Sequence, residues 1–108
     1  MTPELLQAHV KSGELIKGYG KISLLRELVD ALVCDDGFRV SIQASVTHYC
    51  SPRDNDGPYS SFELGFPSSA DDLITKYADD PDKPTGTVYG YVPLAVVLAL
   101  IEKHGGVK

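Results

Sequence analysis

The sequence predicts a single α+β domain over residues 1–108, in which about four helices pack against a three-stranded, mainly antiparallel sheet in the order ααββαβα. Two observations support this fold class. Apolar and polar residues alternate without interruption from Phe38 to Cys50, which is the pattern of a strand with one buried face. In residues 24–33, apolar residues instead recur at the i, i+4 spacing of a helix. Strands joined by a hairpin are usually antiparallel.

The first element expected is a helix that begins at Pro3. Thr2 can cap its first turn, and proline suits the first helical position. Ser12 and the glycine after it should end this helix. Residues 14–21 contain two glycines and predict an irregular, flexible connector. They lack the spacing of a phosphate-binding loop, and no strand precedes them.

A second helix should follow, capped by Ser23 and continuing through residues 24–33. Its two adjacent apolar rows would give a broad face for packing against the sheet. Residues 35–37 are turn formers and lead into the long strand Phe38–Cys50. We expect the rest of the chain to pack against the apolar face of that strand.

Eight turn-forming residues, Ser51–Pro58, predict the long tip of a hairpin, and Tyr59–Phe66 predicts its second strand. A short third helix should begin at Ser68 or Ser69 and present Leu73, Ile74 and Tyr77 to the core.

Residues 79–86 form a second polar loop, after which Thr87–Val92 predicts the third strand. Strict alternation would turn its valines inward and place Tyr89 and Tyr91 together on the other face. The last helix should begin after Pro93 and end near Lys103. Because its segment Leu94–Ile101 is apolar all round, it is either the central core helix or a contact between two copies in a homodimer.

Composition excludes several classes of function. The net charge is -5 and the ten basic residues are scattered, which argues against direct nucleic-acid binding. The longest apolar run is far too short to cross a membrane. With two cysteines and no signal peptide, we expect a cytoplasmic protein with reduced thiols. No spacing of His, Cys, Asp or Glu predicts a metal site, and no motif predicts a cofactor.

The polar face of the sheet and the first long loop form the candidate partner-binding surface. Tyrosine is enriched at interfaces because it buries a large area and keeps a hydroxyl for hydrogen bonding. Alternatively, the tyrosines are ordinary cross-strand pairs, and the loop arginine pairs locally with its acidic neighbours. The candidate residues are Tyr49, Arg53, Asp54, Asp56, Tyr59, Glu63, Tyr89 and Tyr91.

His48 and Cys50 lie two residues apart on the predicted strand and therefore on one face. A thiolate and an imidazole could form a nucleophilic pair. Both residues also continue the apolar face, so the alternative is that they belong to the core.

Four segments, His48–Arg53, Gly57–Tyr59, Glu63–Pro67 and Val88–Pro93, resemble small accessory proteins encoded by bacteriophages, prophages and plasmids. The resemblance implies binding to a host protein, as in inhibitors of bacterial defence systems such as anti-CRISPR proteins. It assigns no role to any residue. The leading hypothesis is therefore a non-enzymatic protein-binding module. The alternatives are a small-molecule or nucleotide binder, with Arg53, Tyr49 and Tyr59 around the ligand, and an enzyme that uses Cys50 and His48.

Overall fold

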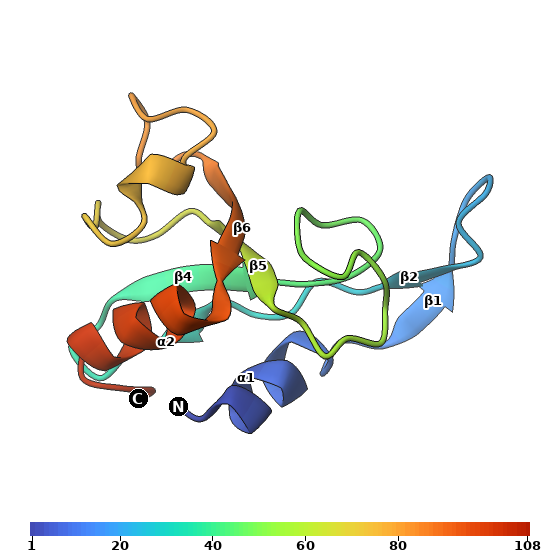
Figure 1. Cartoon of the computed structure of the whole chain (residues 1–108), viewed down its shortest axis with the longest axis horizontal. Coiled ribbons are helices and arrows are strands. Elements are labelled where there is room, and N and C mark those ends of the chain that lie inside the picture. Colours follow the sequence, from blue (N-terminus) through green and yellow to red (C-terminus); the bar gives the residue numbers. More distant parts are fainter.

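The computed structural model describes all of residues 1–108 and combines two α-helices with six strands in two antiparallel sheets (Figure 1). The predicted count of three strands and about four helices, and the order ααββαβα, are therefore wrong. One sheet has two strands, β1-β2, and the other has four in the order β3-β4-β5-β6. The elements are α1 (Pro3–Val10), β1 (Leu15–Lys17), β2 (Leu24–Arg26), β3 (Leu32–Val33), β4 (Arg39–Gln43), β5 (Ser61–Gly65), the 3₁₀ helix η1 (Thr75–Tyr77), β6 (Val88–Pro93) and α2 (Leu94–Lys103).

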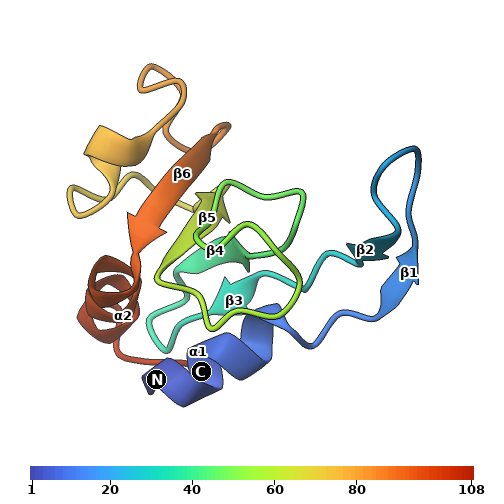
Figure 2. The same cartoon turned by 45° about the vertical axis from the view of Figure 1, so that its right-hand side comes forward.

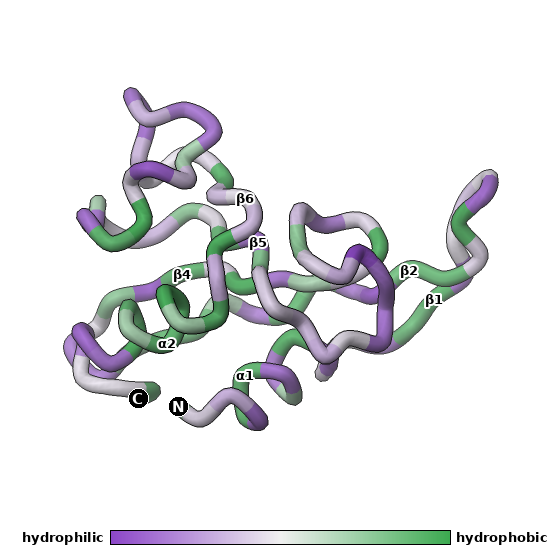
Figure 3. The backbone as a smooth tube through the Cα atoms, in the orientation of Figure 1, coloured by the Kyte–Doolittle hydropathy of each residue, from purple (hydrophilic) through white to green (hydrophobic).

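The core lies between the four-stranded sheet and the two α-helices. Val40 and Ile42 of β4 and Phe62 and Leu64 of β5 are completely buried. They form one cluster with the buried faces of α1 and α2, and α2 packs against β5 and β6. Figure 3 shows the hydrophobic segments of α2 beside those of β4. Neither α-helix is long and apolar enough to cross a bilayer.

Both terminal helices follow the sequence prediction closely. The Thr2 hydroxyl accepts a hydrogen bond from the Leu5 backbone N–H at 3.1 Å and so caps α1. The last helix ends at Lys103, and Gly105 follows it with a φ of 91°. This left-handed conformation suits glycine, so the predicted end of the helix is confirmed.

The second predicted helix, over residues 24–33, does not form. Its residues instead provide β2, β3 and the segment between them, and Leu28 of the expected apolar face is 73% exposed. The buried Gln43 side chain explains this outcome. It donates to the Val29 carbonyl at 2.8 Å and accepts from the Val29 N–H at 3.1 Å, as a neighbouring strand would. Tertiary hydrogen bonding of the backbone therefore outweighs the helical spacing of the leucines.

The long predicted strand is also much shorter than expected, because it ends at Gln43. The hydroxyl of the buried Ser45 accepts a hydrogen bond from the Thr47 N–H at 3.2 Å, and its carbonyl accepts from His48 N–H at 3.2 Å. Ser45 thus holds the backbone in a local turn, and the hydrogen bonds between neighbouring strands end before it. The predicted antiparallel pairing of β4 with the following strand is confirmed, but the connection between them is longer than predicted.

The third predicted helix is reduced to the short η1. Asp71 bends the chain before it, since its carboxylate accepts from the Leu73 N–H at 2.9 Å. Ile74 is completely buried as predicted, whereas Leu73 is 37% exposed. The helical spacing of this segment therefore produces a single turn of helix.

Residues Glu14–Glu27, which we call the arm, extend away from the four-stranded sheet (Figures 1 and 2). The prediction of an irregular connector over residues 14–21 was wrong, because these residues form β1 and the turn of a regular hairpin. Arg26 fixes the base of the arm. Its guanidinium donates to the carbonyls of Lys11 at 2.9 Å, Gly13 at 2.7 Å and Asn55 at 2.7 Å.

Candidate functional site

A β-bulge in β6 decides which tyrosines reach the surface. Phe62 pairs with Val92 and Leu64 pairs with Tyr89, so two residues of β6 face the single residue Glu63 of β5. The extra residue shifts the alternation by one. Tyr89 therefore points into the core with 1% exposure, whereas Tyr91 is 49% exposed. The prediction that both lie on one exposed face is wrong.

The bulge holds Tyr91 in an unfavourable backbone conformation, with a φ of 53°. A bulky side chain in the left-handed region costs of order 1–3 kcal/mol, and such strain is concentrated at functional sites. The Tyr91 N–H donates to the Tyr49 carbonyl at 2.9 Å. A Cβ at Gly90 would lie 3.2 Å from the Tyr49 Cβ, so a glycine at this position permits the close approach of the two segments.

The bulge thereby turns Tyr91 toward Tyr49, which also contacts the predicted residues Arg53 and Glu63. We call these four residues, Tyr49, Arg53, Glu63 and Tyr91, the tyrosine patch. The two tyrosine rings lie 6.0 Å apart at an angle of 42°, and each side chain is about half exposed. The Arg53 guanidinium lies 5.3 Å from the centre of the Tyr49 ring, within the range of a cation–π contact. The Glu63 carboxylate accepts a hydrogen bond from the Tyr49 N–H at 3.2 Å.

A hollow of about 360 Å³ adjoins the tyrosine patch. Tyr49 and Tyr91 form part of its wall, and its only charged lining side chain is Asp79. The remaining lining residues are Tyr77, Ala78, Val88 and Gly90. The hollow and the patch together form a continuous aromatic surface.

The other predicted residues of the first loop have supporting positions. Tyr59 is buried, and its hydroxyl donates to the Asp54 carbonyl at 2.8 Å. Burial raises the pKa of Tyr59 to about 12, so this hydroxyl stays protonated. The Asp54 carboxylate accepts from the N–H groups of Asp56 at 3.0 Å and Gly57 at 2.9 Å, which closes the loop. The Tyr59 hydroxyl is therefore engaged within the loop, and Arg53 forms no ion pair with either aspartate.

The His48 and Cys50 side chains form no hydrogen bond with each other, and both instead contact Ser45. The His48 Nδ1 contacts the Ser45 hydroxyl at 2.6 Å, and the Cys50 thiol donates to the Ser45 carbonyl at 3.3 Å. Burial raises the pKa of Cys50 and lowers the pKa of His48, which keeps both groups neutral. No group of three or more His, Cys, Asp or Glu residues is placed to hold a metal ion.

His104 is the centre of a charged cluster that no local sequence pattern indicates. Its ring stacks on Phe38 with centroids 3.9 Å apart. Nδ1 lies 2.7 Å from an Asp36 carboxylate oxygen and Nε2 lies 2.8 Å from one of Asp71, which also accepts from Lys103 at 3.1 Å. These residues are distant in the sequence. Because every member of the cluster is already paired, we assign it to stability rather than to ligand binding.

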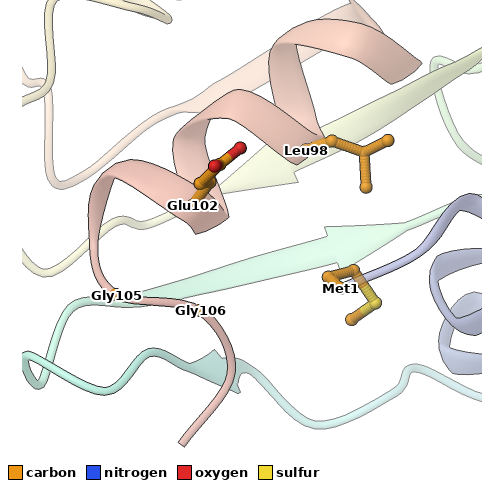
Figure 4. Close-up of a pocket in the computed structure, with 5 residues that line it drawn as sticks. All are labelled: Met1, Leu98, Glu102, Gly105 and Gly106. Carbon is orange, nitrogen blue, oxygen red and sulfur yellow. The ribbon is translucent and has the colours of Figure 1, made fainter.

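A larger cavity of about 570 Å³ lies between the N-terminal residue and α2 (Figure 4). Its lining residues are Met1, Leu98, Glu102, Gly105 and Gly106. Glu102 is the only charged side chain among them, and none of them is a residue predicted from the sequence to bind a partner. The tyrosine patch is therefore the better candidate site.

Comparison with family models, curated proteins and solved structures gave no match.

Proposed function

We propose that the protein is a non-enzymatic protein-binding module that holds its partner through the tyrosine patch. The observation that carries the proposal is Tyr91, an exposed aromatic residue in a strained backbone conformation. Folding alone would favour glycine at this position, and the Tyr91 ring lies beside the exposed Tyr49 ring, so the side chain supports a binding role. Tyrosine and arginine are the residue types that most often dominate binding energy at protein interfaces.

The proposed partner is a bacterial host protein, which the chain inhibits by stoichiometric binding. The support for this partner is the resemblance of His48–Arg53 and Val88–Pro93 to segments of phage and plasmid accessory proteins, since these segments carry three members of the tyrosine patch. An inhibitor of a bacterial defence system is the most specific form of the proposal.

The hollow beside the patch favours a second candidate function, the binding of a small molecule. Its volume of about 360 Å³ falls within the range of ligand sites, and its lining is mostly apolar and aromatic. The ligand would stack against Tyr49 and Tyr91, with Asp79 to accept a hydrogen bond. This arrangement replaces the pocket around Tyr59 expected from the sequence.

The decisive variant is Tyr91→Gly, with Phe66→Gly as its matched control. Phe66 is the other exposed non-glycine residue with positive φ, at 49°, but it lies outside the tyrosine patch. Glycine relieves the strain at either position and adds freedom to the unfolded chain, so both variants should keep the wild-type stability within about 1 kcal/mol. Loss of a central tyrosine should weaken partner binding by about 2 kcal/mol, or roughly 30-fold.

The measurement is capture of partners from a bacterial lysate by the tagged chain, followed by native mass spectrometry and titration of the purified partner. Wild type and Phe66→Gly should retain a stoichiometric protein that Tyr91→Gly loses. Equal affinity of all three chains for that protein would refute the proposal. A rise in thermal stability with a nucleotide or metabolite, absent in Tyr91→Gly, would instead support the small-molecule function.

A further inference from the structure

The arm is a well-defined hairpin, although it lies apart from the main sheet. Gly20 has a φ of 59° in the turn Tyr19–Ile22, which the Ile22 N–H closes by donating to the Tyr19 carbonyl at 3.0 Å. A Cβ at Gly18 would come within 2.2 Å of the Ile22 carbonyl oxygen, so only glycine fits there. Together with the Arg26 clamp at its base, these contacts give the arm a fixed form.

Both faces of the arm expose apolar side chains. Leu15 and Leu24 lie on one face with 46% and 45% exposure, and Ile16 lies on the other with 42%. Tyr19 at the tip is 82% exposed. A two-stranded hairpin is at best marginally stable in water unless its apolar surface is covered. The arm is therefore built to be covered by another molecule.

The charge of the arm differs from that of the rest of the chain. The arm contains Lys17, Lys21 and Arg26 together with Glu14 and Glu27 at its base, which gives it a charge of +1. Because the whole chain carries -5, the remaining residues carry -6, and the two lysines lie toward the tip of the arm. The exposed aliphatic side chains suit a protein surface better than nucleic acid, and the positive charge selects an acidic one.

The acidic body of the chain offers such a surface beside α2. A groove of about 600 Å³ lies between η1 and α2, with a mainly apolar floor that includes Leu73, Ala95 and Ala99. Asp72 lines it, and the exposed Glu102 continues the helical stripe of the two alanines. The one cation of the groove, Lys76, has its ammonium 5.3 Å from the centre of the Tyr77 ring.

We propose that the arm of one copy docks into the α2–η1 groove of a second copy of this chain. The arm cannot reach its own groove, because the two lie at opposite ends of a molecule 38 Å long (Figures 1 and 2). The leucines and Tyr19 of the arm would cover the alanines of α2, and its two lysines would face Asp72 and Glu102. Reciprocal exchange of the arms closes a symmetric dimer.

The test is a charge exchange followed by native mass spectrometry and sedimentation at low salt. Wild type should be dimeric, and rising salt should weaken the dimer. Lys17→Glu/Lys21→Glu and Asp72→Lys/Glu102→Lys should each weaken self-association at least tenfold, because each places like charges at the contact. A mixture of the two variants should form a 1:1 heterodimer. All four side chains are exposed and Lys17, Lys21, Asp72 and Glu102 form no ion pair, so folding should be unaffected.

Wild type that stays monomeric at high micromolar concentration would overturn the proposal, as would dimers that both variants retain. Monomeric variants that fail to recombine would place the contact elsewhere. Salt-sensitive binding of the monomer to an oligonucleotide through the arm would assign it to nucleic acid instead. Because none of these variants alters the tyrosine patch, the proposed function can fail or survive independently.

Discussion

Replacing His104 with alanine should destabilise the fold in a pH-dependent manner. The ring is 15% exposed and bridges Asp36, before β4, to Asp71, before η1, while it stacks on Phe38. Burial of the ring favours its neutral form, but the hydrogen bonds to the two carboxylates outweigh this effect and raise the pKa of His104. The imidazolium has two N–H donors and satisfies both carboxylates, whereas the neutral ring can satisfy only one.

The magnitude follows from the contacts that are lost. The hydrogen bond to the buried Asp71 carboxylate contributes about 1.5–3 kcal/mol, at the lower end because Lys103 continues to pair with Asp71. The stack on Phe38 adds about 0.5–1.5 kcal/mol. The His104→Ala variant should therefore lose about 2–4 kcal/mol, which corresponds to a fall in Tm of roughly 10–25 °C for a domain of this size.

The pH dependence has a defined sign. Because the pKa of His104 is raised, its contribution is complete below the ordinary value of 6.5 and is lost as pH rises through the raised pKa. The pKa of Asp71 is lowered: its burial opposes ionisation, but the Leu73 N–H, His104 and Lys103 outweigh the burial. Its contribution is present above the ordinary 3.8 and is lost as pH falls through the lowered pKa. The difference between wild type and variant should be largest between these two values and smaller at alkaline pH.

Urea unfolding of wild type and His104→Ala at pH 5.5 and pH 8.5 measures this difference, with His9→Ala as the control. The His9 Nε2 is buried without a hydrogen-bond partner, and burial lowers its pKa, while the charge of Asp30 opposes the shift. Native His9 therefore costs stability as pH falls below 6.5, so its replacement should show the opposite pH trend. Equal losses for His104→Ala at both pH values would refute the charged-bridge reasoning.

Three further predictions concern buried residues. Cys50 should react slowly with iodoacetamide at neutral pH and rapidly once the chain is unfolded, because burial raises its pKa; fast labelling of the native protein would contradict its position. Gln43→Ala should cost about 2–3 kcal/mol in urea unfolding, since it leaves the Val29 N–H and carbonyl without partners; a loss below 1 kcal/mol would mean that water replaces the side chain. Tyr59→Phe should cost about 1 kcal/mol by removing the hydrogen bond to Asp54, with faster proteolysis of the loop as the confirming readout.

The sequence predicted the parts of the fold that depend on local signals. The capping threonine, Pro3 and the glycines after Lys103 act within a few residues of the helix ends that they set, and both α-helices were placed accordingly. The β4–β5 hairpin was also predicted, because the turn formers of Ser51–Pro58 separate two alternating runs. In each of these cases the deciding contact and the sequence pattern are close together in the chain.

The secondary-structure predictions are wrong where a side chain distant in the sequence determines the backbone conformation. Residues 24–33 have a helical spacing of leucines, yet their backbone forms hydrogen bonds with distant groups. Val29 bonds to the Gln43 side chain, and the Glu27 N–H donates to the Glu14 carbonyl at 2.9 Å. Helix propensities differ by a few tenths of a kcal/mol per residue. The two buried hydrogen bonds between the Gln43 side chain and the Val29 backbone are sufficient to outweigh these differences. No local pattern could reveal that Gln43 would face Val29.

The sequence correctly predicts the exposure of some residues of the candidate site but not of others, because the bulge in β6 depends on pairing with a distant strand. Tyr49, predicted on the polar face of the long strand, and Arg53, predicted in the loop, are both exposed. Strict alternation instead predicts Tyr89 and Tyr91 on one face, which is wrong. One additional residue in β6 separates them, and its only sequence signal is Gly90 in the middle of a strand. Tyr89→Ala would consequently remove a core side chain and destabilise the fold by about 3–5 kcal/mol, whereas Tyr91→Gly tests the surface alone.

The tyrosine patch and the arm differ in how the chain maintains them. At the arm, local preference and structure agree, because Gly18 and Gly20 occupy the positions where only glycine is free of strain. At the patch they disagree, because Tyr91 occupies a conformation that glycine would adopt more easily. Phe66 has a similar conformation outside the patch, so the support for a binding role at Tyr91 is its strain together with its place beside the exposed Tyr49 ring. The arm instead exposes Leu15, Ile16 and Leu24, and a monomer would gain solubility if polar residues replaced them.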